Sequence, residues 1–220
     1  PWTGVLTTVE KGSAMVAAGA AVAVLAFGLA FGARAAGGAD SLGYVSQAYL
    51  WLKGDLRIEQ PLSSVQPWPY TDESVAPLGY KPGVGASRHT SVPTYAPGLS
   101  MIMAGSLLAC GHCGPFYVGP FFAALLVMCT WGLAHRLSGD GLASALAALL
   151  MAGSPTLLFN VVAPMSDAVA AALWIASLVL LTWPRPWHAA AAGVVAGAAI
   201  LVRPNLVPLV LANILAAELW

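Results

Sequence analysis

Long apolar runs separated by short polar turns cover most of the chain, and this pattern predicts helices that cross a membrane. The first run, residues 13–31, follows Glu10 and Lys11 and has about the 20 residues that a hydrocarbon core requires. Later runs of the same character are 116–133, 142–159, 168–183 and 189–202, and another begins at 207. A cleaved signal peptide is the alternative for the first run, because the alanine-rich residues 34–36 offer a cleavage site.

The apolar run 96–110 is shorter, since its length of about fifteen residues falls below the roughly 17–25 that a span needs. We expect a re-entrant or interfacial helix there. Lys11, Arg136 and Arg185 then share one side, which the positive-inside rule makes cytoplasmic. The outer side receives Asp40, Asp167 and Arg203. If the run crosses fully, the two aspartates are separated by the membrane.

A polar loop, residues 34–94, interrupts the apolar pattern. Residues 41–53 place Leu42, Val45, Tyr49 and Leu52 at helical spacing, which predicts a short helix in the headgroup region. From residue 60 to residue 97 the loop is rich in proline, and we expect irregular backbone there. The chain is therefore interpreted as one transmembrane module, 1–220, with an outer loop at 34–94. We expect it to be the first part of a longer protein.

Composition supports an integral membrane protein. Hydrophobic residues make up 59% of the chain and charged residues 8%, against about 25% charged in soluble domains. The formal net charge is zero, so no electrostatic field favours nucleic acid, and we predict no binding to it.

Few charges remain, and those at the ends of apolar runs are candidate functional residues. Asp40 is interpreted either as a general base or as a helix cap, because Asp and Ser both favour the first helical positions. Asp167 has the same two interpretations. Arg203 precedes Pro204 and either binds a lipid phosphate or extends to the headgroups. Two loop residues, Arg88 and His89, are alternatives for the phosphate contact.

Cysteines and glycines add two weaker patterns. Cys110-Gly111-His112-Cys113 has the spacing of a redox or metal-binding pair, but no strand-rich context surrounds it, which favours a plain turn. Cys129 lies inside an apolar run and is interpreted as a core residue. The pairs Gly28/Gly32 and Gly193/Gly197 have the spacing of close helix contacts.

The order of several short motifs resembles a known family. They are Gly38-Ala39-Asp40-Ser41, Tyr95-Ala96-Pro97-Gly98-Leu99, Ser154-Pro155, Pro164-Met165-Ser166-Asp167 and Leu201-Val202-Arg203-Pro204-Asn205. Together they look like the N-terminal module of the GT-C integral membrane glycosyltransferases, in the branch that includes protein O-mannosyltransferases and the lipid A aminoarabinose transferase. The resemblance implies an all-α, multi-pass transmembrane bundle with a large first outer loop.

The same resemblance implies an activity. Such enzymes transfer a sugar from a polyprenyl-phosphate donor, with inversion, to an acceptor on the outer face of a membrane, here the bacterial cell membrane. Asp40 would be the base that deprotonates the acceptor, and Asp167 would orient the base, the donor or a metal. The resemblance implies that no cofactor is required, and it leaves open whether a divalent metal is needed. The partners implied are membrane lipid, the lipid-linked sugar and a glycan, lipid or protein acceptor.

Two geometric and functional expectations follow. The carboxylates of Asp40 and Asp167 should approach one outer cavity, with residues 95–99 in its wall and Tyr95 in contact with substrate. A transporter or flippase of a lipid-linked substrate is the alternative function. It would be indicated by broken helices, midplane ionisable residues and internal repeats. A noncatalytic assembly subunit is the third.

Overall fold

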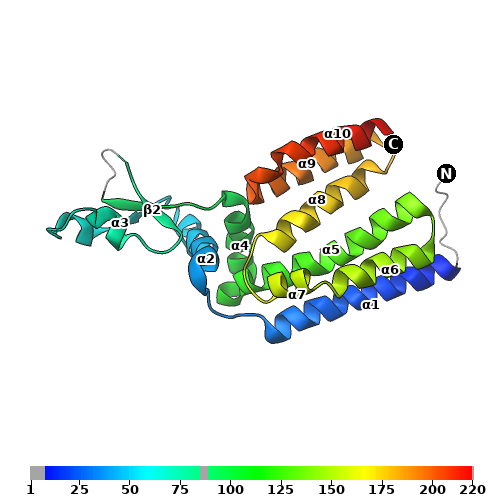
Figure 1. Ribbon diagram of the computed structural model, residues 1–220, viewed down its shortest axis with the longest axis horizontal. Coiled ribbons are helices and arrows are strands. Elements are labelled where there is room, and N and C mark those ends of the chain that lie inside the picture. Colours follow the sequence, from blue (N-terminus) through cyan, green and yellow to red (C-terminus); the bar gives the residue numbers. More distant parts are fainter. Residues whose placement is uncertain (1–7, 85–88, 220) are drawn as a thin grey trace.

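The computed structural model describes residues 8–84 and 89–219 and is mainly helical, with 76% helix and 4% strand. Figure 1 shows an elongated molecule in which a helical bundle carries both termini at one end. Helices α2 and α4 lie at the other end, and a small lobe extends beyond them. The mainly helical fold is confirmed, but the strand content corrects the all-α expectation.

Helix α1, Thr8–Phe31, is apolar and long enough to cross a membrane. Its buried positions Ala17, Ala21, Val24 and Gly28 recur at spacings of three and four, so they form one face. That face packs against α5 and α6 in the main hydrophobic core of the bundle.

The second candidate span lies in the helical run 97–138, which consists of three elements. They are α4, Pro97–Cys110, the 3-10 turn η3, Gly111–Cys113, and α5, Gly114–Ser138. Gly111 takes φ 63° at the junction, and a Cβ on Gly114 would lie 2.2 Å from the carbonyl oxygen of Ser106. The start of α5 therefore packs tightly on α4, and α4 stands across the end of the bundle in Figure 1.

The third candidate span is broken. Helices α6, Gly141–Ala152, and α7, Pro155–Val161, meet at an angle of 53°, which corrects the single straight span expected over 142–159. The break has a local cause, because Pro155 has no N–H to donate and restricts the residue before it. The chain thus has two helices of spanning length and composition, or three if the bent pair is one span.

The remaining apolar helices are shorter than the candidate spans. They are α8, Asp167–Leu181, α9, Pro186–Val202, the 3-10 helix η4, Pro204–Leu209, and α10, Val210–Leu219. Helix α8 packs on both α5 and α9, and α4 contacts α9. A second hydrophobic cluster joins α2, α4, α8 and the end of α9, and this cluster fixes the end of the bundle on which the lobe stands.

The lobe begins with α2, Gly38–Lys53, which matches the helix expected at 41–53. The other elements are β1, Ile58–Glu59, η1, Pro61–Ser64, α3, Thr71–Val75, β2, Tyr80–Pro82, and β3, Thr90–Pro93. The three strands form an antiparallel sheet in the order β1-β3-β2. The expectation of irregular backbone from residue 60 to residue 97 was therefore wrong for β2 and β3, in which proline is only the last residue.

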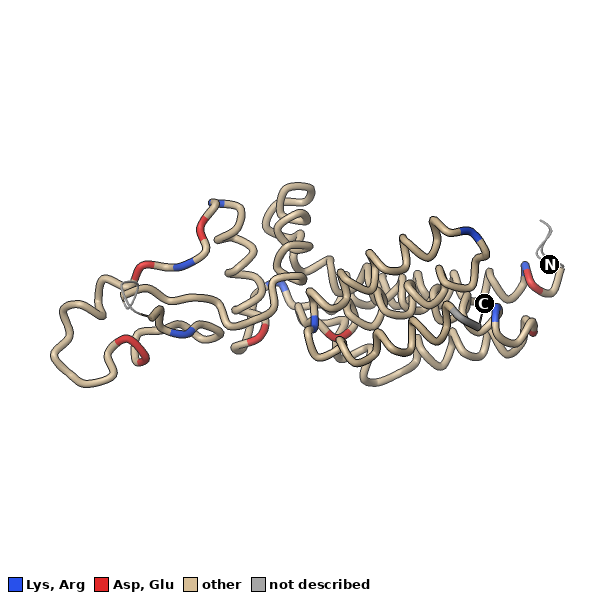
Figure 2. The backbone as a smooth tube through the Cα atoms, turned by 90° about the horizontal axis from the view of Figure 1, so that it is seen from above, with Lys and Arg blue, Asp and Glu red and all other residues tan. Residues whose placement is uncertain are grey.

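Charged residues gather at the two ends of the bundle and in the lobe, with uncharged helix between them (Figure 2). At the end that carries the termini, the Arg136 guanidinium lies 4.1 Å from the centre of the Trp183 ring. At the opposite end, Arg203 pairs with Asp167. The fold therefore places Arg136 at one end of the bundle and Arg203 with Asp167 at the other, which is the grouping that the sequence predicted.

Candidate functional site

The first half of the candidate site is built on α2. Asp40 lies in the first turn of this helix, whose N-cap is Gly37, and the N-cap makes no side-chain capping bond. The carboxylate instead accepts a hydrogen bond at Oδ1 from the Tyr95 hydroxyl, at 2.5 Å. Asp40 is exposed. The capping interpretation of Asp40 is not supported.

Two glycines hold the ring of Tyr95. A Cβ on Gly43 would lie 2.3 Å from the ring carbon Cε2, and a Cβ on Gly79 would lie 2.8 Å from the same atom. Gly79 has φ 83°, a conformation that also favours glycine. The Tyr44 ring packs on the Tyr95 ring at a centroid distance of 4.8 Å. Tyr95 therefore has a fixed position, and its hydroxyl is directed at Asp40.

The hydrogen bond changes the acidity of the phenol. It raises the pKa of Tyr95 to about 12, with smaller contributions from burial and from the negative charge of Asp40. Tyr95 consequently keeps its proton at physiological pH and is a hydrogen-bond donor to Asp40.

The second half of the site joins the start of α8 to the end of α9. Asp167 is the first residue of α8, and Ser166 is its N-cap without a side-chain capping bond. Arg203 follows α9 and donates from Nη1 to Oδ1 of Asp167. The Arg203 side chain is 39% exposed and the Asp167 side chain is 40% exposed. Asp167 therefore has a charged partner at the bundle end, as a site residue would.

Close backbone contact brings the halves together. A Cβ on Gly98, in the first turn of α4, would lie 2.5 Å from the nitrogen of Val202. The Tyr44 hydroxyl donates to Oγ of Ser166 at 3.2 Å. The segment that carries Tyr95 is thus fixed beside the segment that carries Arg203.

An open pocket of 430 Å³ lies between the halves. Its lining residues are Tyr44, Thr94, Tyr95, Ala96, Val202, Arg203, Pro204 and Asn205. Tyr95 and Ala96 belong to the turn that was predicted to form part of the wall. Asp40 and Asp167 do not line this pocket, but each contacts a residue that does, namely Tyr95 and Arg203.

A smaller cavity of 190 Å³ lies on the other side of Asp167. Its walls come from α5, α8 and the broken α6–α7 pair, and they are mostly apolar: Leu126, Met151, Ser154, Thr156, Leu157, Asn160, Asp167, Ala168 and Ala171. Asp167 therefore lies between a polar pocket at the bundle end and an apolar cavity inside the bundle.

The structure does not bring His89 to the pocket. Its Nδ1 lies 2.9 Å from Oγ of Ser63 and 3.5 Å from Oδ1 of Asp72, both within the lobe. The position of His89 close to α4 in the sequence was misleading, because strand β3 separates the two in space. Arg88, the other predicted phosphate contact, lies outside the described residues.

Tyr44 and the glycines Gly43, Gly79 and Gly98 were not predicted as site residues. A signal existed for Tyr44, which follows Asp40 by four residues and so shares its helix face. The glycines gave no such signal, because their contacts are made with residues distant in the sequence.

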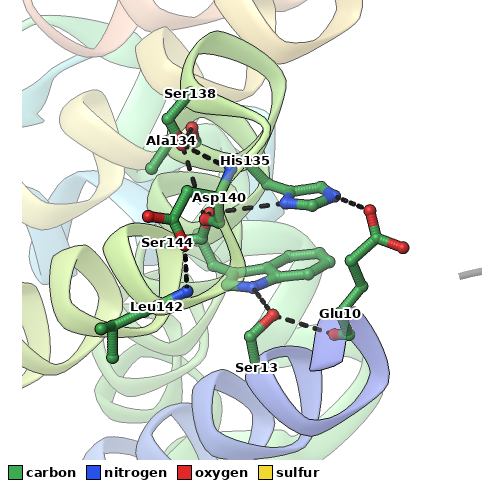
Figure 3. A network of polar contacts seen from close by, with 9 residues as sticks. Glu10, Ser13, Ala134, His135, Ser138, Asp140, Leu142 and Ser144 are labelled. Carbon is green, nitrogen blue, oxygen red and sulfur yellow. Dashed lines mark hydrogen bonds and ion pairs between the residues drawn. The ribbon is translucent and has the colours of Figure 1, made fainter. Parts of the chain in front are cut away.

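A separate polar network ties α1, α5 and α6 at the opposite end of the bundle (Figure 3). Nε2 of His135 lies 3.5 Å from Oε1 of Glu10, and Nδ1 of His135 lies 3.5 Å from Oγ of Ser144. The order Ser, His, Glu is that of a hydrolase triad. Ser144, however, is 0% exposed and donates to the Asp140 carbonyl at 2.5 Å. The network therefore joins helices.

Metal ligation has little support in the part of the chain that the structure describes. Within residues 8–84 and 89–219, no three His, Cys, Asp or Glu side chains lie together as ligands. Fold and composition place the chain among proteins with two or three helices able to cross a membrane. Comparison of the chain with protein-family models, with curated proteins and with solved structures finds no match.

Proposed function

We propose that the chain is a membrane glycosyltransferase module that moves a sugar from a polyprenyl-phosphate donor to an acceptor on the outer face of the membrane. The observation that carries the proposal is the pocket itself. It lies at a bundle end, with a carboxylate behind one wall residue, Tyr95, and a guanidinium, Arg203, in the opposite wall. This transfer requires a base and a cation, and here the cation lines the pocket while the carboxylate lies one hydrogen bond behind a wall residue.

Asp40 acts as the base in this proposal. Tyr95 donates to Oδ1 and holds the carboxylate in place, while Oδ2 takes the proton of an acceptor hydroxyl. The acceptor oxygen then forms a bond to the anomeric carbon as the bond from that carbon to the phosphate oxygen breaks. The configuration inverts, and polyprenyl phosphate leaves with the electron pair.

Arg203 stabilises the phosphate that leaves. Asp167 engages Nη1 of the guanidinium, and the other N–H groups have the planar geometry that suits a phosphate. The apolar cavity beside Asp167 places apolar surface next to the charged pair, as a donor with an isoprenoid chain needs. The pocket also contains Asn205, whose amide donates to sugar or phosphate oxygens.

A transporter or flippase of a lipid-linked substrate is the second candidate, and the broken pair α6–α7 favours it. Discontinuous helices beside a cavity are typical of transporter substrate sites, and the cavity at the break contains Asn160 and Asp167. Against this function, the Asp167–Arg203 pair lies where α8 begins and α9 ends, and Asp40 lies in the first turn of α2, so these charges are at helix ends. An enzyme and a transporter differ in whether the donor loses its sugar.

Sugar transfer by Asp40→Asn tests the proposal. The amide keeps the size of the side chain but cannot take a proton, so transfer from a polyprenyl-phosphate sugar should fall by about 10²–10⁴-fold while donor binding persists. Asp55→Asn, a change of an exposed aspartate elsewhere in the lobe, is the matched control and should keep full activity. Undiminished transfer by Asp40→Asn would remove Asp40 as the base.

Arg203→Ala should affect binding of the donor. Loss of the guanidinium should weaken donor affinity by about tenfold or more, because a charge-assisted contact of roughly 1.5–3 kcal/mol is removed. Binding of labelled polyprenyl phosphate to the full-length protein in detergent measures this. Arg57→Ala, in the lobe, is the control. Movement of intact donor across a vesicle membrane without sugar transfer would favour the transporter.

A further inference from the structure

The corner between α4 and α5 carries two exposed cysteines that the proposed transfer does not use. Cys110 is the last residue of α4, and Cys113 is the N-cap of the 25-residue helix α5. Both are free and exposed, whereas Cys129, within α5, is partly buried. We propose that Cys110 and Cys113 form a redox-active dithiol that exchanges with a disulfide-bearing partner at the pocket end of the molecule.

The backbone of the corner suits a disulfide between the pair. Residues Gly111–Cys113 form a 3-10 turn, with Cys110 as its N-cap. Gly111 takes φ 63° and ψ −151°, near the values of the first central residue of a type II′ turn, in which the Cα atoms of the first and fourth residues lie within about 7 Å. Cys110 and Cys113 are the first and fourth residues of this turn, and a disulfide spans Cα separations of roughly 4.4–6.8 Å. The corner can therefore close the bond with little backbone movement.

The two sulfurs differ in surroundings, which assigns their roles. Cys113 lies at the N-terminal end of α5. Cys110 lies at the opposite kind of helix end, the C-terminus of α4. Thiolates at helix N-termini are the attacking sulfurs in dithiol chemistry. Cys113 is therefore the sulfur that attacks, and Cys110 is the one that resolves.

Contacts from α2 hold the corner in place. The Tyr49 hydroxyl lies 2.7 Å from Nδ1 of His112, and the two rings stack at a centroid distance of 5.9 Å. His112 is thereby fixed against α2, while the cysteines on either side of it stay exposed. This arrangement keeps both sulfurs accessible to a partner.

The exchange balances as follows. The Cys113 thiolate attacks one sulfur of the partner disulfide, a mixed disulfide forms, and the partner's first sulfur leaves as a thiolate. Cys110 loses its proton to solvent and attacks the sulfur of Cys113, and the partner's second sulfur leaves as a thiolate. Two electrons pass from the cysteine pair to the partner, which takes up two protons and becomes a dithiol.

Glutathione disulfide is the probe for the test, applied to the full-length protein with Cys129→Ala. Cys129 follows Cys113 by sixteen residues, about 24 Å along the helix, so its removal leaves the pair unchanged. The protein is equilibrated with glutathione buffers of graded oxidation, and free thiols are then counted by maleimide labelling. Peptide mass analysis shows which sulfurs are linked.

The two thiols should disappear together in one transition, with a Cys110–Cys113 disulfide as product. In Cys110→Ser, the Cys113–glutathione mixed disulfide should accumulate about tenfold or more above its level in the intact pair, because the nearby resolving thiol is absent. Cys113→Ser should accumulate less adduct than Cys110→Ser. Independent oxidation of the two thiols, or equal adduct in both serine variants and the intact pair, would overturn the proposal.

Discussion

Tyr95 connects the two sides of the candidate site at the scale of single residues. Its ring lies against Gly43 and Gly79, and its hydroxyl donates to Asp40. The same side chain lines the pocket that Arg203 faces. The position of the Asp40 carboxylate, the proposed base, therefore depends on a hydrogen bond from Tyr95, and the Tyr95 proton reports on the charge of Asp40.

The acidity of Tyr95 is a direct measure of this contact. The ordinary pKa of 10.0 rises to about 12 because the neutral phenol donates to the carboxylate. Asp40→Asn should lower the pKa of Tyr95 toward 10.0, since the negative charge is gone. The difference in tyrosinate absorbance between each protein and its Tyr95→Phe counterpart isolates this group. Asp55→Asn should leave the value unchanged.

The raised pKa of Tyr95 also sets a pH window for stability. A group that holds its proton more tightly when folded contributes stability that is fully present below its unfolded pKa of 10.0 and is lost as pH rises toward about 12. The protein with Tyr95 should therefore be more stable than Tyr95→Phe at neutral pH. This difference should disappear at the upper end of the pH window. A pH-independent difference would show that the contact is not made.

Sequence reasoning located part of this site for a physical reason. Asp40, Asp167 and Arg203 stood out because charges are costly at the ends of apolar segments, and this holds in any fold. His89 failed because a short sequence distance does not measure a spatial one across β3. The glycine contacts of Tyr95 required the packing of α2 against the loop before β2, which no local pattern contains.

At the scale of helices, α1 contains an internal comparison between two glycines. A Cβ on Gly28 would lie 2.4 Å from Val161 and 2.7 Å from Pro120, whereas a Cβ on Gly19 meets no atom within 4 Å. Gly28 was predicted as a packing residue, and its close contact is present. The other predicted pair, Gly193 and Gly197, also meets no atom within 4 Å, so the prediction was wrong there.

Valine substitutions in α1 test the packing. Gly28→Val should lower the free energy of unfolding by about 1–3 kcal/mol, because the rigid ring of Pro120 cannot move aside. Gly19→Val makes the same change of helix propensity in the same helix but should leave stability nearly unchanged. Thermal unfolding in one detergent, followed by intrinsic fluorescence, compares the two. Equal effects would mean that α1 does not pack on α5 and α7 through Gly28.

Single residues set several helix boundaries, but only some of these boundaries were predicted. Glycine at C′ ends α2 and α5 as helix-stop patterns predict, with Gly54 and Gly139 in the left-handed region. The break between α6 and α7 was missed because apolar residues on both sides continue the pattern through Pro155. The strands of the lobe were missed because two to four residues are too few to show alternation.

For the whole molecule, the two ends of the bundle differ in what they carry. The pocket, the Asp167–Arg203 pair and the cysteine corner lie at the end with the lobe. The other end carries the network of Glu10 and His135 and the contact between Arg136 and Trp183. This division was predictable, because charges separated by apolar helices must alternate between ends. Which end faces outward follows only from the positive-inside rule.

Single cysteines in a background without the three native ones test the orientation. Asn205→Cys, in the pocket wall, should react with a membrane-impermeant maleimide in intact cells. Ser138→Cys, exposed at the end of α5, should react only after the membrane is opened. Labelling of residue 138 from outside, with residue 205 protected, would invert the molecule and place the proposed site in the cytoplasm.

The contact of Gly98 with the backbone of residues 201–202 determines when the pocket can form during synthesis. Its two walls come from segments more than a hundred residues apart in the chain. A nascent chain that has left the ribosome only as far as α4 already contains Asp40, Tyr95 and both of the glycines that hold the tyrosine ring. It lacks the arginine wall until α9 has been made and inserted. The Asp40 side of the pocket is therefore complete before the last helices have been made, and a chain that stops short of α9 has the Asp40 carboxylate without the Arg203 guanidinium.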